Sequence, residues 1–415
     1  MVGADIAPRE RMLRSLTLVA ILVAAAACTN DHHGTGPTGG PVQMNDVTVL
    51  FPLTDVPTKY LAASDAGARG PLLPEALYTA VGPIAGIASG DNPGGFPGDA
   101  AYSDLHVVAM RLDPCFAALP PDPHGVGCTN QLRLVFQQLT PDGTQSTAAD
   151  SALHVFYEIS RDDLIAITEA IGAEREAATS DRLGGLAPHP VIVSQGLDGA
   201  LSASVKALVL DYAGASNLTR VTKLSATSPD LVWAFEGFDV SDATAATITP
   251  MIIPTLAGAT MQQFERDGIT NAAPDPDGDF IPATTSADNL EPLADVNTAS
   301  GLTDAQRQTA FTGLVHVDNP GDHSPNTIDC ASCHLATPAE LGIAKPVYSL
   351  DEATAPDAFT ADGVYVLASE LQPTMALDGS LNIHSLSYVG QSPGINQRVV
   401  NETAAIVAYL NQNAE

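Results

Sequence analysis

The stretch Gln131-Leu132-Arg133-Leu134-Val135-Phe136-Gln137 places an apolar side chain at every second position, which is typical of a half-buried β-strand. The stretches 105–111 and 153–157 have the same character, and two more strands are expected near 218–224 and 231–240. Helix-like segments alternate with these strands. The sequence therefore predicts a sheet-rich α+β domain over 45–271.

Two helices are predicted within this domain. The first begins after Ser160, whose side chain is expected to form a capping box with Asp163, and continues to about Ala177. The second covers 202–212, and the single tryptophan, Trp233, is expected in the core. The histidines of this region lack metal-ligand spacing, and we interpret them as structural or surface residues: His106, His124, His154 and His189.

The last part of the chain has a different character. A stretch rich in Pro, Asp and Ala at 272–297 is interpreted as a linker. Beyond it, 298–415 is expected to form a small, mostly helical domain that begins with a short helix at 302–308 and closes with one at about 397–411. Apolar residues give the closing helix a buried face: Val399, Val400, Ile406, Val407 and Leu410.

Residues 1–27 are interpreted as a signal peptide, because basic residues precede an apolar run that is too short to span a bilayer. The run ends in Ala25-Ala26-Ala27-Cys28, which resembles the lipobox of bacterial lipoproteins. The resemblance implies that Cys28 is acylated. The stretch 28–44, which is rich in Gly, Pro, Thr and His, is interpreted as a flexible tether. The alternative is ordinary signal cleavage that leaves a free thiol, because Ala25 stands where lipoboxes commonly have a larger aliphatic residue.

Similarity to Gram-negative lipoproteins, with Thr29 directly after the cysteine, implies attachment to the periplasmic face of the outer membrane. The formal net charge is −31, and it becomes −32 when residues 1–27 are removed with their three arginines and two acidic residues. Such a surface repels nucleic acid and attracts basic proteins. We therefore expect no nucleic-acid partner and a membrane contact through the lipid; the alternative role of the charge is solubility alone.

An exported chain meets an oxidising compartment, where pairs of cysteines form disulfides. Cys115 and Cys128 flank the turn-rich segment 120–125 between two strand-like runs, and a disulfide between them is predicted. Two free thiols are one alternative, and a metal pair with His124 is another.

The two remaining cysteines lie in Cys330-Ala331-Ser332-Cys333-His334. Two thiols three residues apart can add to the two vinyl groups of a haem, and the adjacent histidine can bind the iron. The motif predicts one covalent haem c, held by Cys330, Cys333 and His334. A thioredoxin-like redox pair would need a strand-to-helix context, and a zinc site would need a second pair of ligands at suitable spacing; the sequence around the motif has neither.

The region around this motif resembles the cytochrome c family. The motif is followed by Met375 and by a last helix that ends Ile406-Val407-Ala408-Tyr409-Leu410, which is the order of parts in small class I cytochromes c. The resemblance implies a helical haem domain with Met375 as the distal iron ligand. The loop 318–325 departs from the family, because it stands where class I cytochromes pack their N-terminal helix.

Other residues compete with Met375 for the distal position. His323 is the main alternative, because the chain between it and Cys330 is long enough to pass round the edge of a haem. His384, His316 and an open, five-coordinate iron are the remaining alternatives.

If two protein ligands saturate the haem iron, the chemistry that remains for it is one-electron transfer. The sequence therefore predicts a membrane-anchored electron-transfer cytochrome whose partner is a basic redox protein, with no catalytic residue assigned. One alternative is a scaffold or binding lipoprotein whose haem is structural or sensory. Another is a haem peroxidase or oxidase, which would need an open distal site beside an acid-base residue.

Overall fold

The structure is a computed structural model, and it describes residues 41–86, 98–114, 129–226, 232–251, 262–265, 288–323, 328–359 and 383–412. Several sequence predictions lie outside these ranges: the signal peptide with Cys28, the proposed Cys115–Cys128 disulfide, and Met375. Among the described helices, none is both long and apolar enough to cross a membrane.

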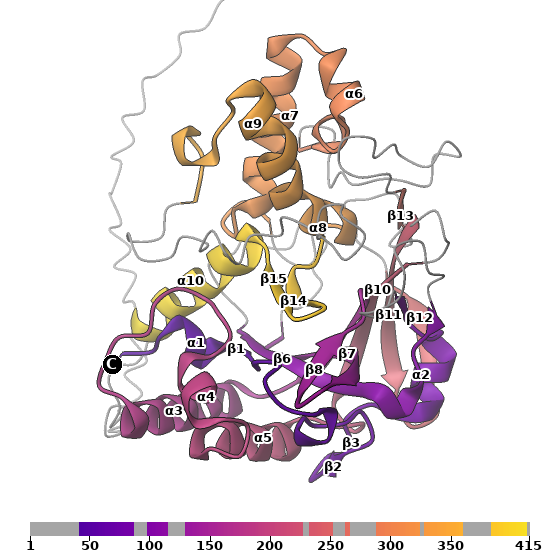
Figure 1. Cartoon of the computed structure of the whole chain (residues 1–415), viewed down its shortest axis with the longest axis vertical. Coiled ribbons are helices and arrows are strands. Elements are labelled where there is room, and N and C mark those ends of the chain that lie inside the picture. Colours follow the sequence, from indigo (N-terminus) through magenta and orange to yellow (C-terminus); the bar gives the residue numbers. More distant parts are fainter. Residues whose placement is uncertain are drawn as a thin grey trace, which may run out of the picture. The chain divides into compact units, whose positions relative to one another are not determined.

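A large antiparallel sheet forms the centre of the described chain (Figure 1). Its strands are Thr48–Leu50 (β1), Leu105–Asp113 (β6), Gln131–Asp142 (β7), Gln145–Ala148 (β8), Ala152–Glu158 (β9), Leu218–Ala226 (β10), Val232–Asp242 (β11), Thr247–Pro250 (β12) and Gln262–Glu265 (β13). They follow the order β1-β6-β7-β9-β10-β11-β12, with β8 paired to β7 and β13 paired to β11. All five predicted strands are therefore present, and the α+β class is confirmed.

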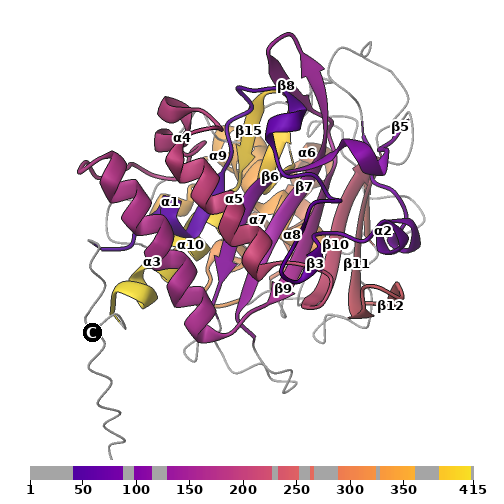
Figure 2. The same cartoon turned by 90° about the horizontal axis from the view of Figure 1, so that it is seen from below.

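Helices α3 (Arg161–Ala178), α4 (Pro190–Gln195) and α5 (Ala200–Tyr212) lie on one side of the sheet (Figure 2). The predicted capping box begins α3: the Ser160 hydroxyl accepts from the backbone N–H of Asp163 at 3.0 Å, and the Asp163 carboxylate accepts from the N–H of Ser160 at 3.3 Å. Apolar residues of α3 and α5 share a core with strand residues such as Leu153 and Val155.

The C-terminal elements lie on the other side of the sheet (Figure 1). They are Glu291–Leu293, α6 (Val296–Ser300), α7 (Asp304–Asp318), α8 (Cys330–Ala339), a π-helical turn at Glu340–Ala344, α9 (Lys345–Tyr348), Glu352–Thr354, β14 (Leu386–Val389), β15 (Ser392–Ile395) and α10 (Gln397–Gln412). The helix predicted at 302–308 is longer than expected, because Phe311, Leu314 and Val315 continue its buried face to Asp318.

The sheet and the C-terminal helices share two cores. Leu224, Trp233 and Phe235 of the sheet pack with α7 and α8, and Trp233 is fully buried as predicted. Val399 and Val407 of α10 belong to the core that also contains the strands and α3. The division into domains at 272–297 stays a prediction, since residues 266–287 lie outside the described chain.

Smaller elements complete the described chain. They are α1 (Met44–Val47), α2 (Glu75–Val81), the short strands Ala66–Gly67 (β2), Gly70–Pro71 (β3), Ala85–Gly86 (β4) and Gly98–Asp99 (β5), and the 3-10 turns Pro57–Lys59 and Tyr102–Asp104. The first and last described elements meet: the Asn411 side chain exchanges hydrogen bonds of 2.8 and 3.0 Å with the backbone of Val42. Thr48 of β1 and Thr403 of α10 are also hydrogen-bonded, at 2.8 Å.

Candidate functional site

The Cys330–His334 motif forms the first turns of α8. The carboxylate of Asp329 accepts a hydrogen bond from the backbone N–H of Ser332 at 2.9 Å, and this cap starts the helix directly at Cys330. Residues three and four apart share a face of a helix. The cap therefore presents Cys330, Cys333 and His334 together on one side of α8.

Both thiols of the motif are half-buried and unbridged. Burial, aided by the nearby charge of Asp329, raises the pKa of the Cys330 thiol to about 12. Burial and the charge of Glu402 raise the pKa of the Cys333 thiol to about 11. Redox-active CxxC pairs instead have thiol pKa values below the ordinary one, so these surroundings disfavour a thioredoxin-like activity.

His334 is oriented by a hydrogen bond to the backbone. Its Nδ1 lies 2.6 Å from the carbonyl oxygen of Ile383, and since a carbonyl oxygen only accepts, Nδ1 carries the proton. Burial lowers the pKa of the His334 imidazole to about 4, so the ring is neutral at pH 7 and its Nε2 keeps a lone pair. A ring held in this way is the arrangement of metal-ligating histidines. The ring of Phe235 packs beside it, with centroids 5.2 Å apart.

The closing helix holds α8 in place. The amide of Asn396 donates to the carbonyl oxygen of Cys333 at 2.7 Å, and its oxygen caps α10 by accepting from the N–H of Val399 at 2.9 Å. The backbone N–H of Gln397 donates to the hydroxyl of Thr337 at 2.8 Å. The motif is thus fixed to the start of α10 by side-chain hydrogen bonds.

Buried ion pairs connect α10 to the sheet. Glu402 contacts Arg111 of β6 and lies 2.6 Å from the guanidinium of Arg398. Burial alone would raise the pKa of Glu402, but the charges of Arg111 and Arg398 outweigh it and lower the pKa to about 2. Arg398 also donates to the carbonyl oxygens of Val317 and His323, at 2.8 and 2.7 Å, and so binds the end of α7.

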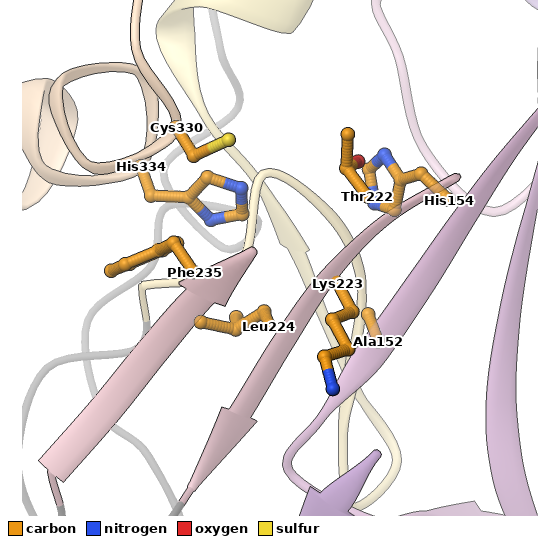
Figure 3. Close-up of a pocket in the computed structure, with 8 residues that line it drawn as sticks. All are labelled: Ala152, His154, Thr222, Lys223, Leu224, Phe235, Cys330 and His334. Carbon is orange, nitrogen blue, oxygen red and sulfur yellow. The ribbon is translucent and has the colours of Figure 1, made fainter. Parts of the chain in front are cut away.

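A small pocket lies between α8 and the sheet (Figure 3). Its empty space is about 240 Å³. The residues that line it are Ala152, His154, Thr222, Lys223, Leu224, Phe235, Cys330 and His334. This volume is below the range of roughly 300–1,000 Å³ typical of whole small-molecule sites. The pocket is therefore smaller than a site for a whole haem, and it brings Cys330, His334 and His154 to one space.

The donor set of the motif on α8 suits a c-type haem, although of its two thiols only that of Cys330 lines the pocket. Two thiols share a helix face with a neutral imidazole whose proton is already held by a carbonyl group. In the described part of the chain, no three His, Cys, Asp or Glu side chains are grouped as a metal-binding cluster would require. A zinc site built from the described residues would need such a group, whereas an iron held in a porphyrin needs only axial ligands.

The alternative distal candidates have other contacts. His316 Nδ1 and His323 Nε2 donate to the two oxygens of Asp288, at 2.6 and 3.2 Å. Burial would raise the pKa of Asp288, but the hydrogen bonds from His323 and His316 lower it to about 2. His384 is buried, with Nε2 2.5 Å from the carboxylate of Asp150 and Nδ1 bonded to the Ser387 hydroxyl.

Sequence reasoning singled out only Cys330 and His334 among the eight residues that line the pocket, and it missed His154 and Phe235 beside them. His154 was interpreted as structural because it lacks a ligand-like spacing to other histidines. A signal was present, however: residues 152–157 are all buried, so His154 is an imidazole inside an otherwise apolar strand. Such a side chain needs a buried partner.

The chain was compared with known proteins by family, by sequence and by structure. No protein-family model, no curated protein and no solved structure matches it.

Proposed function

We propose that this chain is a membrane-anchored c-type cytochrome, which carries one haem on Cys330, Cys333 and His334 and transfers single electrons. The hydrogen bond from His334 Nδ1 to the Ile383 carbonyl carries the proposal, because it fixes the neutral ring with Nε2 unprotonated beside Cys330. The bound haem would supply one-electron chemistry at its iron. The chain contributes the attachment thiols and the oriented imidazole.

The packing of the C-terminal helices supports this role. Asn396 and Gln397 hold α8 from the closing helix, so the two thiols and the imidazole keep one orientation. Helix α7 packs against both α8 and α10. The acidic surface favours a basic redox partner, and the lipid proposed on Cys28 would hold the protein at the outer membrane.

The test is to produce the full chain in a bacterium that has the haem-attachment machinery. We expect one haem to remain on the denatured polypeptide, detected by haem staining of a gel and by intact mass. A Cys330→Ser, Cys333→Ser double variant should lose it. A matched Cys115→Ser, Cys128→Ser variant should keep it, and Cys28→Ser should keep it while leaving the membrane fraction.

The outcomes separate the candidate functions. A wild-type chain without covalent haem would refute the proposal. Ready binding of carbon monoxide to the reduced protein would reveal an open iron and favour the peroxidase, oxidase or sensor alternatives. A reduced protein that takes up no carbon monoxide would support electron transfer.

A further inference from the structure

The pocket places a second imidazole opposite the haem motif. Figure 3 shows the ring of His334 extending from α8 on one side, and the ring of His154 extending from β9 on the other, into the space between them. Both residues line the same pocket although 180 positions separate them in the sequence. The sheet and the motif therefore each offer one histidine to a single cavity.

The period-two geometry of β9 fixes the direction of His154. Leu153, Val155 and Tyr157 belong to the core shared with α3 and α5, so the alternation of the strand directs His154 to the opposite side, where it lines the pocket with His334 of α8. In the sheet register, His154 lies beside Val135 of β7 and Thr222 of β10. A central strand with neighbours on both sides gives the histidine a rigid support.

His154 is buried, and its ring makes no hydrogen bond within the described chain. Only 8% of its surface is exposed. Its nitrogens are not among the fully enclosed, unpaired side-chain atoms of the described residues, and His154 lines the pocket, so they open to the pocket space and can bind a group placed there. Burial, together with the charge of Arg133, lowers the pKa of His154 well below its ordinary value, which leaves the ring neutral.

The other candidates lack this combination. The ring nitrogens of His384 are engaged by Asp150 and Ser387, and His323 donates to Asp288. His154 alone among these three shares the pocket with His334.

We infer that His154 is the second axial ligand, so that the iron is held between α8 and the central sheet. This inference rests on the proposed haem attachment and replaces Met375 and His323 in the distal role. A second imidazole in place of a methionine lowers the reduction potential, because thioether ligation raises it. The sheet domain thereby gains a function: it supplies one of the two protein ligands of the iron.

The experiment uses spectra of the full-length protein in both oxidation states. We expect the wild type to show a low-spin iron with the near-infrared magnetic circular dichroism of two imidazole ligands, and no carbon monoxide binding. His154→Gly should retain covalent haem but lose the low-spin spectrum and bind carbon monoxide. Added imidazole should restore the low-spin spectrum by entering the vacated space.

The matched control is His106→Gly. His106 is also a buried strand histidine, 7% exposed, but its Nδ1 bonds to the carbonyl oxygen of Asp104 and it does not line the pocket. The His106→Gly variant should keep the wild-type spectrum. Met375→Leu and His323→Gln should also keep the wild-type spectrum.

Each other outcome has a defined meaning. A sulfur-ligand signature in the wild type would overturn the inference, even if His154→Gly fails to fold. So would a low-spin spectrum that survives in His154→Gly but is lost in Met375→Leu or His323→Gln. A wild type without covalent haem would instead refute the proposed function itself, as judged by the denaturing gel rather than by ligand spectra.

Discussion

Replacing Glu402 with glutamine should weaken the attachment of α10 to the sheet by several kcal/mol. Glu402 is 12% exposed and contacts two arginines that are each 2% exposed, Arg111 and Arg398. The gap between the ordinary pKa of 4.5 and a pKa of about 2 corresponds to roughly 3 kcal/mol, since one pKa unit is worth about 1.4 kcal/mol. Measured losses for breaking one partner of a buried ion pair are similar, about 3–5 kcal/mol.

The assay is urea denaturation followed by the fluorescence of Trp233, which is fully buried in the folded protein. We expect Glu402→Gln to lower the free energy of unfolding by about 3 kcal/mol at pH 7. Because the pKa of Glu402 is lowered by folding, its contribution is complete above pH 4.5 and disappears as the pH falls toward 2. The difference between wild type and variant should therefore shrink as the pH is lowered from 7 to 3.

An exposed pair provides the control. Asp239 lies 2.8 Å from Arg220 but is 46% exposed, so Asp239→Asn should change the stability by less than about 1 kcal/mol. If Glu402→Gln changes the free energy of unfolding no more than Asp239→Asn does, or if its effect is the same at pH 7 and pH 3, the reasoning is wrong.

Three further predictions concern stability and the support of the motif. His189 is fully buried, neither of its ring nitrogens has a hydrogen-bond partner among the described residues, and burial lowers its pKa to about 4. As the pH falls below 6.5 the unfolded state takes up a proton on His189 while the folded state does not, so the wild type loses up to about 3 kcal/mol of stability between pH 6.5 and 4. The His189→Leu variant should not show this loss, measured as melting temperature against pH. Asn396→Ala removes the bonds to Cys333 and Val399 and should cost about 1–3 kcal/mol in urea denaturation; an unchanged midpoint would contradict the role of this side chain. Ser160→Ala removes a helix cap and should cost about 1 kcal/mol in the same measurement, whereas Ser160→Gly should cost only a few tenths.

Local signals predicted most of the elements. The five strands, the Ser160 capping box and the closing helix were all predicted from periodicity and capping residues, because these signals act over a few neighbouring positions. The helix after 302 was predicted too short, since its second half is stabilised by tertiary packing of Phe311 and Leu314 rather than by a distinctive local pattern.

The pocket could be predicted only in part. The motif gives Cys330, Cys333 and His334, because the attachment chemistry requires a fixed local spacing. The approach of β9 to α8 depends on the sheet register and on buried contacts such as Arg111 with Glu402, which join residues 291 positions apart. The sequence marks His154 only as an imidazole within an apolar strand, and no nearby pattern shows which distant element that strand meets.

The hydrogen bonds between Val42 and Asn411 have a consequence for biogenesis. They join residues 369 positions apart, so this closing contact carries a large loop-closure entropy and forms late in folding. A chain that emerges from its N-terminus, as in the export proposed for this protein, cannot seat α10 beside β1 until nearly all of it has emerged. Until then β1, the terminal strand of the sheet, stays exposed to mispairing with other chains. A truncation that removes α10 should therefore produce an aggregating precursor rather than a smaller soluble protein.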